Sequence, residues 1–185
     1  MPFKLSWGAR VRRLRKALRG LMIGTLALGL ALYVGWRAGL DQSPADRLLE
    51  PGTQAFQSLT TDDAIMSLIK RHERLRLDAY KGAGGNWLIG YGHKATAEEG
   101  MTITEAEADA LFEADLREVE LRLKRRIDAP IRRREFSALV DLAYNVGPTR
   151  VNNSTLMKRF NAGDRQGAAD GLLDWTKITV DGEKV

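Results

Sequence analysis

One carboxylate of this chain stands where it could do acid–base chemistry. Glu73 ends an amphipathic segment in which Ile65, Leu68 and Ile69 recur at helical spacing, and a glycine-rich turn and a glycine–aromatic stretch follow it. A carboxyl group at a helix end that is partly removed from water keeps its proton near neutral pH. Such a group is suited to protonate the leaving oxygen in glycoside cleavage, so Glu73 is the candidate general acid.

A small β-hairpin is expected directly after Glu73. Residues 77–81 and 87–93 alternate as strands do, and the turn at 82–85 contains three glycines, which tolerate positive φ and would let a sugar chain approach the backbone. Tyr80 and Trp87 are candidates for stacking on sugars, with core packing as the alternative. His93 is expected to pair with a carboxylate and brace the hairpin rather than to catalyse.

The remaining elements that would position Glu73 are predicted to be helices. Thr60 with Asp63, and Thr104 with Glu107, have the spacing of capping boxes. Apolar residues recur at helical spacing in four segments: 112–123, 136–144 (ended by Gly147-Pro148), 156–160 (after a cap at 152–154) and 168–173. A turn at 181–182 between alternating residues predicts a second hairpin. These elements predict an α+β, mostly α fold with a small β-hairpin subdomain.

Charge is distributed unevenly along the chain. The formal net charge is +5, but residues 1–40 hold eight Lys and Arg and no acid, which leaves 21 basic and 24 acidic residues in 41–185. The main domain is therefore acidic overall, and a nucleic-acid partner is not expected. The chain has no Cys and only two His, so no metal site is expected either, and nothing in the sequence implies a cofactor.

The N-terminus has the pattern of a membrane anchor. Residues 20–36 form an uncharged run of 17 residues behind the basic cluster, which predicts a single span with its N-terminus in the cytoplasm. We expect a basic leader at 1–19, a signal anchor at 20–40, a linker at 41–62 and the main domain at 63–185. A cleaved signal peptide is the alternative. The glycine content makes the anchor only weakly apolar, so it could leave the membrane more readily than a Leu-rich one.

Several motifs in order resemble the phage-type lysozymes, the endolysins of the bacteriophage muramidase family. That family's motif runs E-G-x-R-L-x-A-Y, a turn, then T-I-G-Y-G-H, and this chain has E-R-L-R-L-D-A-Y at 73–80 and L-I-G-Y-G-H at 88–93. Later blocks at 100–108, 138–139, 144–147, 153–156, 161–164 and Trp175 are similar too. The weakly apolar anchor resembles that of the signal-anchor-release members.

The resemblance implies a function and a location. It implies a lysozyme-like fold that cleaves the β-1,4 bond between N-acetylmuramic acid and N-acetylglucosamine in peptidoglycan, with Glu73 as the acid and Asn145 as a substrate contact. It also implies a monomer held in the inner membrane with its domain in the periplasm, and possible release from the anchor. The family continues beyond the last hairpin with paired Arg and a closing helix, so the domain is expected to be truncated at Val185.

The chain departs from the family at three positions near the acid. The family has an Asp nine residues after the Glu and a Thr six further on, where this chain has Gly82 and Leu88. Neither can orient a water molecule, and Asp78 is a doubtful substitute because it lies within a strand. Arg74 replaces a Gly, which places a cation beside Glu73 and would lower the pKa of that carboxyl if the two were close.

Three readings of the site stay open. In the first, the protein is a hydrolase in which Asn86 or a backbone carbonyl orients the water. In the second, it is a one-carboxylate enzyme like the lytic transglycosylases, in which a hydroxyl of the substrate attacks and Glu73 is acid and then base. In the third, it is a membrane-tethered glycan-binding protein that has lost catalysis.

Overall fold

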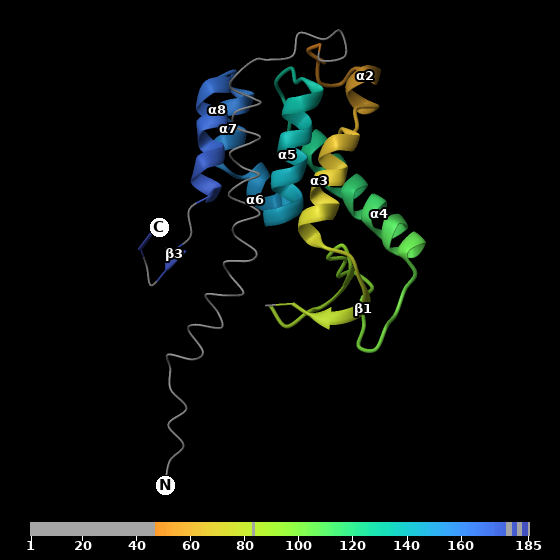
Figure 1. The fold of residues 1–185 in the computed structure, drawn as a ribbon. Helices are drawn as coiled ribbons and strands as arrows, with labels where there is room; N and C mark the ends of the chain where they lie inside the picture. The colour runs from red at the N-terminus through yellow and green to blue at the C-terminus, as the bar shows by residue number, and fades with distance from the viewer. Residues whose placement is uncertain (1–46, 83, 177–178, 181–182, 185) are drawn as a thin grey trace.

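The computed structural model describes residues 47–82, 84–176, 179–180 and 183–184 of the chain (Figure 1). The expected leader at 1–19 and anchor at 20–40 lie outside the described residues. No helix in the described part is long and apolar enough to cross a membrane.

The described residues form a mostly helical fold with a small antiparallel sheet, as expected. The helices are α2 (Gln54–Gln57), α3 (Asp63–Glu73), α4 (Glu105–Lys124), α5 (Arg133–Val146), α6 (Pro148–Asn152), α7 (Thr155–Asn161) and α8 (Arg165–Leu172), followed by a 3-10 turn at Leu173–Thr176. The strands are β1 (Arg76–Lys81), β2 (Trp87–Gly90), β3 (Thr179–Val180) and β4 (Glu183–Lys184). In Figure 1 the β1–β2 hairpin lies at the C-terminal end of α3, and α4 to α8 form the helical lobe.

Most helix ends follow the expected capping chemistry. Thr104 and Glu107 form the expected capping box at the start of α4, and Ser154 accepts a hydrogen bond from the Met157 N–H at the start of α7. Gly147 ends α5 with φ 92°, a conformation that favours glycine, and Pro148 then starts α6. The expected second hairpin is confirmed, because β3 and β4 pair antiparallel.

The expected capping box at Thr60 and Asp63 is wrong. The residue that precedes α3 is Asp62, and its side chain makes no capping hydrogen bond. The chain is fixed there by a contact with α4 instead, because Oε1 of the buried Glu120 accepts hydrogen bonds from the N–H and the hydroxyl of Thr61, both at 2.7 Å. A long-range contact of this kind overrides a local capping signal.

The linker prediction for 41–62 is wrong in its second half. Leu49 exchanges backbone hydrogen bonds with Ile131, and Phe56 and Leu59 are each only 1% exposed. The folded domain therefore includes residues from about 49 on. The turn at 51–52 interrupts this segment, so its few apolar residues show no periodicity, although burying each of them stabilises the fold by roughly 1.5–3 kcal/mol.

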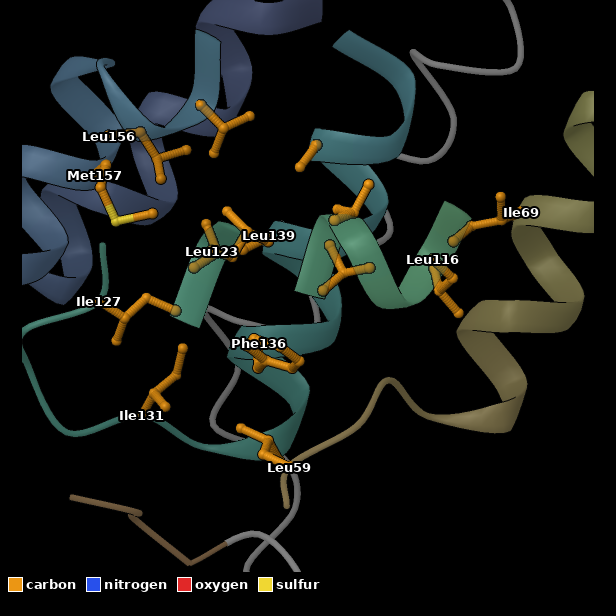
Figure 2. Packing of buried hydrophobic residues seen from close by; sticks show 14 of the residues in the cluster. Leu59, Ile69, Leu116, Leu123, Ile127, Ile131, Phe136, Leu139, Leu156 and Met157 are labelled. Atoms are coloured by element: carbon orange, nitrogen blue, oxygen red, sulfur yellow. The ribbon is translucent and has the colours of Figure 1, made fainter. Parts of the chain in front are cut away.

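The core lies between α4, α5 and the helices that surround them (Figure 2). Leu123 of α4 lies beside Leu139 of α5, Leu116 lies toward Ile69 of α3, and the stripe expected at 112–123 is buried. Asp62 at the start of α3 is joined to α5, since its N–H donates to the Ser137 hydroxyl at 3.0 Å. Helix α3 is therefore tied to α5 at its N-terminal end, and the direction of α3 decides where Glu73 lies.

Candidate active site

Glu73 lies at the last position of α3 and is half-buried. A Cβ atom added to Gly92 would be 3.4 Å from Glu73 Oε2, so the carboxylate faces bare backbone in the loop after β2. Burial raises the pKa of Glu73 above its ordinary value. The cation at Arg74 is exposed and does not reverse that rise. The carboxyl is therefore biased toward its protonated form, which a general acid needs.

The C-terminal end of α3 is held by contacts with α4 and with the loop after β2. Lys70, one turn before Glu73, places its Nζ 2.8 Å from Asp109 Oδ1 on α4. The same Nζ lies 5.2 Å from the ring centre of Tyr91 and 5.1 Å from that of Phe112. An ion pair and two cation–π contacts on one side chain fix the last turn of α3, and with it the acid.

The loop after β2 folds tightly because of two glycines. Ile89 and His93 exchange both backbone hydrogen bonds at 2.9 Å, so the three residues between them form a closed turn. Gly90 has φ 63° and Gly92 has φ 91°, both in the region that favours glycine. A Cβ on Gly90 would also lie 3.4 Å from the Ala108 Cβ of α4. This turn brings the Gly92 backbone to Glu73.

His93 closes this turn, and its side chain is buried. Its Nδ1 is 2.9 Å from Asp115 Oδ2, and its Nε2 accepts a hydrogen bond from the Thr96 N–H at 3.2 Å. Because Nε2 accepts, Nδ1 is the nitrogen that carries a proton and donates it to Asp115. The ring therefore joins the loop to α4, and both of its nitrogens are engaged away from Glu73.

Two groups on α5 complete the surroundings of Glu73, and the sequence reasoning missed both roles. The Tyr144 hydroxyl donates to the Tyr91 carbonyl at 3.1 Å, next to Gly92. Burial and the negative charge of Glu73 are among the causes that raise the pKa of Tyr144. Asp141, one turn earlier, is 1% exposed, and burial followed by the charge of Glu73 raises its pKa from 3.8 to about 7.

A signal in the sequence could have revealed Asp141. It is the only charged residue between Glu135 and Arg150, and it stands within an apolar run of a buried helix. Lys, Glu, Arg and Asp are seldom fully buried unless they are paired. Within the described residues, Asp141 Oδ1 is buried and has no hydrogen-bond partner.

The other candidate site residues are on the β1–β2 hairpin and on α5. Tyr80 on β1 is half-buried beneath the Arg76 guanidinium, and burial and then the charge of Glu73 raise its pKa. Asn86 is exposed in the hairpin turn, and Trp87 beside it contacts Lys81. Asn145 is exposed, but its side-chain amide donates to the Asp141 carbonyl at 3.0 Å.

Gly82 and Leu88, the two departures from the family motif, lie against each other across the hairpin. A Cβ added to Gly82 would be only 2.7 Å from Leu88 Cδ1. The Gly82 N–H donates to the Asn86 carbonyl at 2.9 Å, which closes the turn. Leu88 thus occupies the space that a side chain at 82 would need. Asp78 is exposed and accepts a hydrogen bond from the Thr102 hydroxyl at 3.0 Å.

Comparison with known proteins adds independent information. A family model described as "Phage lysozyme" matches residues 70–185. An endolysin of Acyrthosiphon pisum secondary endosymbiont phage 1 is 38% identical over 117 residues, which is 63% of this chain and 80% of the relative. A SAR-endolysin of Enterobacteria phage P21 is 38% identical over 100 residues, 52% of this chain and 59% of the relative.

Solved structures with the same fold include a muramidase. The muramidase domain of SpmX from Asticaccaulis excentricus has a TM-score of 0.63 and 32% sequence identity, and the match covers 68% of this chain and 86% of that domain. The lysozyme-like fold expected from the sequence is thereby confirmed for the described domain.

Replacing Arg74 by Gly is expected to stabilise the protein. Arg74 has φ 60°, the one positive φ of a described non-glycine residue, and such a conformation costs roughly 1–3 kcal/mol. Relief of this strain is partly offset because glycine has more conformational entropy in the unfolded chain. Arg74→Gly should therefore raise the free energy of unfolding by about 1 kcal/mol in urea titrations. Arg74→Ala removes the charge but keeps the Cβ, so it should give no such gain. Equal stabilisation by both variants would show that charge, not backbone strain, is responsible.

Replacing Asp141 by Asn is expected to change how stability depends on pH. The pKa of Asp141 is about 7 in the folded protein and 3.8 in the reference state, so between these values the folded form holds a proton that the unfolded form releases. Protonated Asp141 makes its full contribution to the free energy of unfolding below about pH 4. This contribution, up to about 4 kcal/mol, is lost as the pH rises through about 7. Urea titrations of Asp141→Asn should therefore show a gain over the wild type that grows from pH 4 to pH 8. A gain independent of pH would contradict the buried, proton-holding carboxyl.

Proposed function

The chain belongs to the phage lysozyme family, and on this premise we propose that it cleaves the β-1,4 glycan strands of peptidoglycan with Glu73 as the proton donor. The observation that carries the proposal is the half-buried Glu73 carboxyl at the end of α3, against the bare backbone of Gly92, with its pKa raised by burial. The names of the relatives, endolysin and muramidase, support the substrate.

In the proposed reaction Glu73 gives its proton to the glycosidic oxygen between N-acetylmuramic acid and N-acetylglucosamine. The bond from C1 to that oxygen breaks, and positive charge develops at C1. Gly92 has no side chain, so a sugar can approach the acid on that side. Tyr80, whose pKa responds to Glu73, and Trp87 on β2 are the proposed stacking surfaces, and Asn86 and Asn145 are the proposed polar contacts.

The packing of Leu88 over Gly82 favours a second candidate, in which no water-orienting carboxylate is needed. After Glu73 has protonated the leaving oxygen, its carboxylate takes the proton from the C6 hydroxyl of the muramic acid. The C6 oxygen then bonds to C1, which yields a 1,6-anhydro end and restores the protonated acid. The third reading, glycan binding without cleavage, would keep the same fold and the same contacts.

We also propose that the domain acts in the periplasm as a monomer, from an inner-membrane anchor at 20–40 that can be released. The weakly apolar run at 20–36 and the SAR-endolysin relatives support this location.

Replacing Glu73 by Gln is expected to abolish cell-wall clearing. Gln is nearly isosteric but has no acidic proton, and loss of a general acid typically costs 100- to 10,000-fold in rate. Purified Gram-negative sacculi should lose turbidity with the wild-type protein and not with Glu73→Gln, while thermal unfolding stays close to that of the wild type. Glu118→Gln, which removes an exposed carboxylate on α4, is the matched control and should clear at the wild-type rate.

The products of the same reaction separate the candidates. Reducing N-acetylmuramic acid ends identify hydrolysis, and 1,6-anhydro ends identify attack by the substrate's own hydroxyl. If neither the wild type nor Glu73→Gln clears sacculi and both are retained on them equally, the function is glycan binding and the catalytic proposal is wrong.

Restoring the family side chains at 82 and 88 is expected to work only as a pair. Gly82→Asp alone would place its Cβ 2.7 Å from Leu88 Cδ1, so the end of the leucine must move, at a cost of roughly 0.5–1.5 kcal/mol if it leaves its rotamer. Adding Leu88→Thr removes the obstructing methyl group, so the double variant should regain most of that stability in urea titrations and should release more reducing ends than the wild type. Wild-type stability of Gly82→Asp alone would contradict the described packing. A stable double variant with unchanged products would show that these positions do not limit hydrolysis.

A further inference from the structure

We propose that the end of the domain at which the chain enters from residues 1–46 binds the anionic phospholipid surface of the membrane. This surface, the basic end, consists of residues 47–48 and 121–134. The inference rests on the proposed anchor at 20–40 for its setting and is independent of the chemistry at Glu73.

Positive charge is concentrated in one short segment of the basic end. Residues 122–134 hold seven Lys and Arg and a single acid, Asp128, whereas the rest of 41–185 holds 14 basic and 23 acidic residues. The segment is therefore an exception in a domain that is otherwise strongly acidic. Clusters of roughly four to eight Lys and Arg beside a membrane segment bind anionic lipid headgroups.

The fold brings this segment to the point of chain entry. Leu49 and Ile131 exchange backbone hydrogen bonds at 2.8 and 3.0 Å, and Lys124 Nζ donates to the Gln57 carbonyl at 2.8 Å. Ten residues, 37–46, separate the apolar run at 20–36 from the first described residue. Ten residues span at most roughly 35 Å, so a chain anchored at 20–36 keeps the basic end close to the bilayer surface.

Two arginines of the basic end are available to a ligand. Arg47 and Arg125 are exposed and make no ion pair within the described residues. Arg126 lies 3.3 Å from one exposed carboxylate, and an exposed pair of this kind is weak. Arg132 differs, because the buried Glu135 accepts hydrogen bonds from its N–H and its guanidinium. Arg132 therefore has a structural role, and the test uses the first two arginines.

Exposed apolar side chains lie beside these two arginines. Leu48 is 45% exposed and follows Arg47 directly, and Leu121 is 47% exposed. Residues four apart share a helix face, so Leu121 lies next to Arg125 at the end of α4. At a membrane interface apolar side chains enter the boundary with the acyl chains while cations bind the headgroups. A soluble polyanion would bind the arginines and leave both leucines in water, so the pattern favours a lipid surface.

Docking at the basic end points the proposed acid away from the membrane. Arg133 Nη1 donates to the Thr60 carbonyl at 3.2 Å, so the basic end lies at the N-terminal end of α3. Glu73 ends the same helix, and 11 residues at a rise of about 1.5 Å separate the two ends by roughly 16 Å. In Figure 1 α2 and the hairpin with β1 lie at opposite ends of the domain. A domain docked in this way presents its candidate active site to the cell wall.

The test uses the full chain reconstituted in vesicles of phosphatidylcholine with and without phosphatidylglycerol. Because the chain has no Cys, a single cysteine can carry an environment-sensitive fluorophore at a chosen position. Leu121→Cys places the label in the basic end, and Leu77→Cys places it on β1. The label at 121 should shift to the blue only with phosphatidylglycerol and should lose the shift at high salt, while the label at 77 should report water throughout.

A double variant with a matched control assigns the shift to named cations. Each Lys or Arg near an anionic surface strengthens binding roughly fivefold, so Arg47→Gln with Arg125→Gln should lower the ratio of docked to undocked domain roughly 25-fold and remove most of the shift at 121. Arg71→Gln with Lys94→Gln removes the same charge from exposed positions near the other end of the domain and should keep the shift. Circular dichroism should show the same helix content in both double variants.

The outcomes separate the inference from the proposed anchor. If the full chain floats with both kinds of vesicle and the label at 121 reports water in both, the anchor stands and the inference is wrong. If the chain binds only vesicles with phosphatidylglycerol and the label at 121 shifts, the inference stands and the proposed anchor is wrong. Equal loss of the shift in both double variants would attribute the attraction to overall charge and overturn the inference. Retention on sacculi that depends on Arg47 and Arg125, without a shift on vesicles, would assign the surface to an acidic wall polymer instead.

Discussion

The site depends on one constraint, the removal of the Glu73 carboxyl from water at the C-terminal end of a helix. The carbonyl groups at that end carry partial negative charge, which disfavours a second negative charge beside them. Burial acts in the same direction and raises the pKa of Glu73. Every neighbouring feature serves this placement: Lys70 fixes the last turn of α3, the glycines at 90 and 92 bring the loop close, and His93 ties that loop to α4.

Local sequence signals predicted the elements around Glu73 well. The glycine-rich turn between alternating residues indicated the β1–β2 hairpin, and the stripe from Phe112 to Leu123 indicated α4 with its cap at Thr104. These predictions succeeded because periodicity and capping are properties of short segments. The family motif also named Glu73 and Tyr80, and the charge of Glu73 is one cause, after burial, that raises the pKa of Tyr80.

What the sequence could not show depends on contacts between distant segments. Thr61 is fixed by Glu120, 59 residues away, so the true start of α3 has no local signal. Phe56 and Leu59 are buried, and Leu49 is paired with Ile131, by contacts that no periodic pattern in the sequence indicates. The burial of Asp141 was missed for the same reason, because it depends on the elements that pack around α5.

The two departures at 82 and 88 are best understood as a single packing change. A glycine alone would leave a gap beside the hairpin, and a leucine alone would collide with a side chain at 82, but together they fill one volume. A side chain at 82 would have to displace the end of Leu88, whose Cδ1 lies 2.7 Å from the position of a Cβ there. Attack by a hydroxyl of the substrate needs no second carboxylate, so the packing of Leu88 over Gly82 is the observation that favours the second candidate.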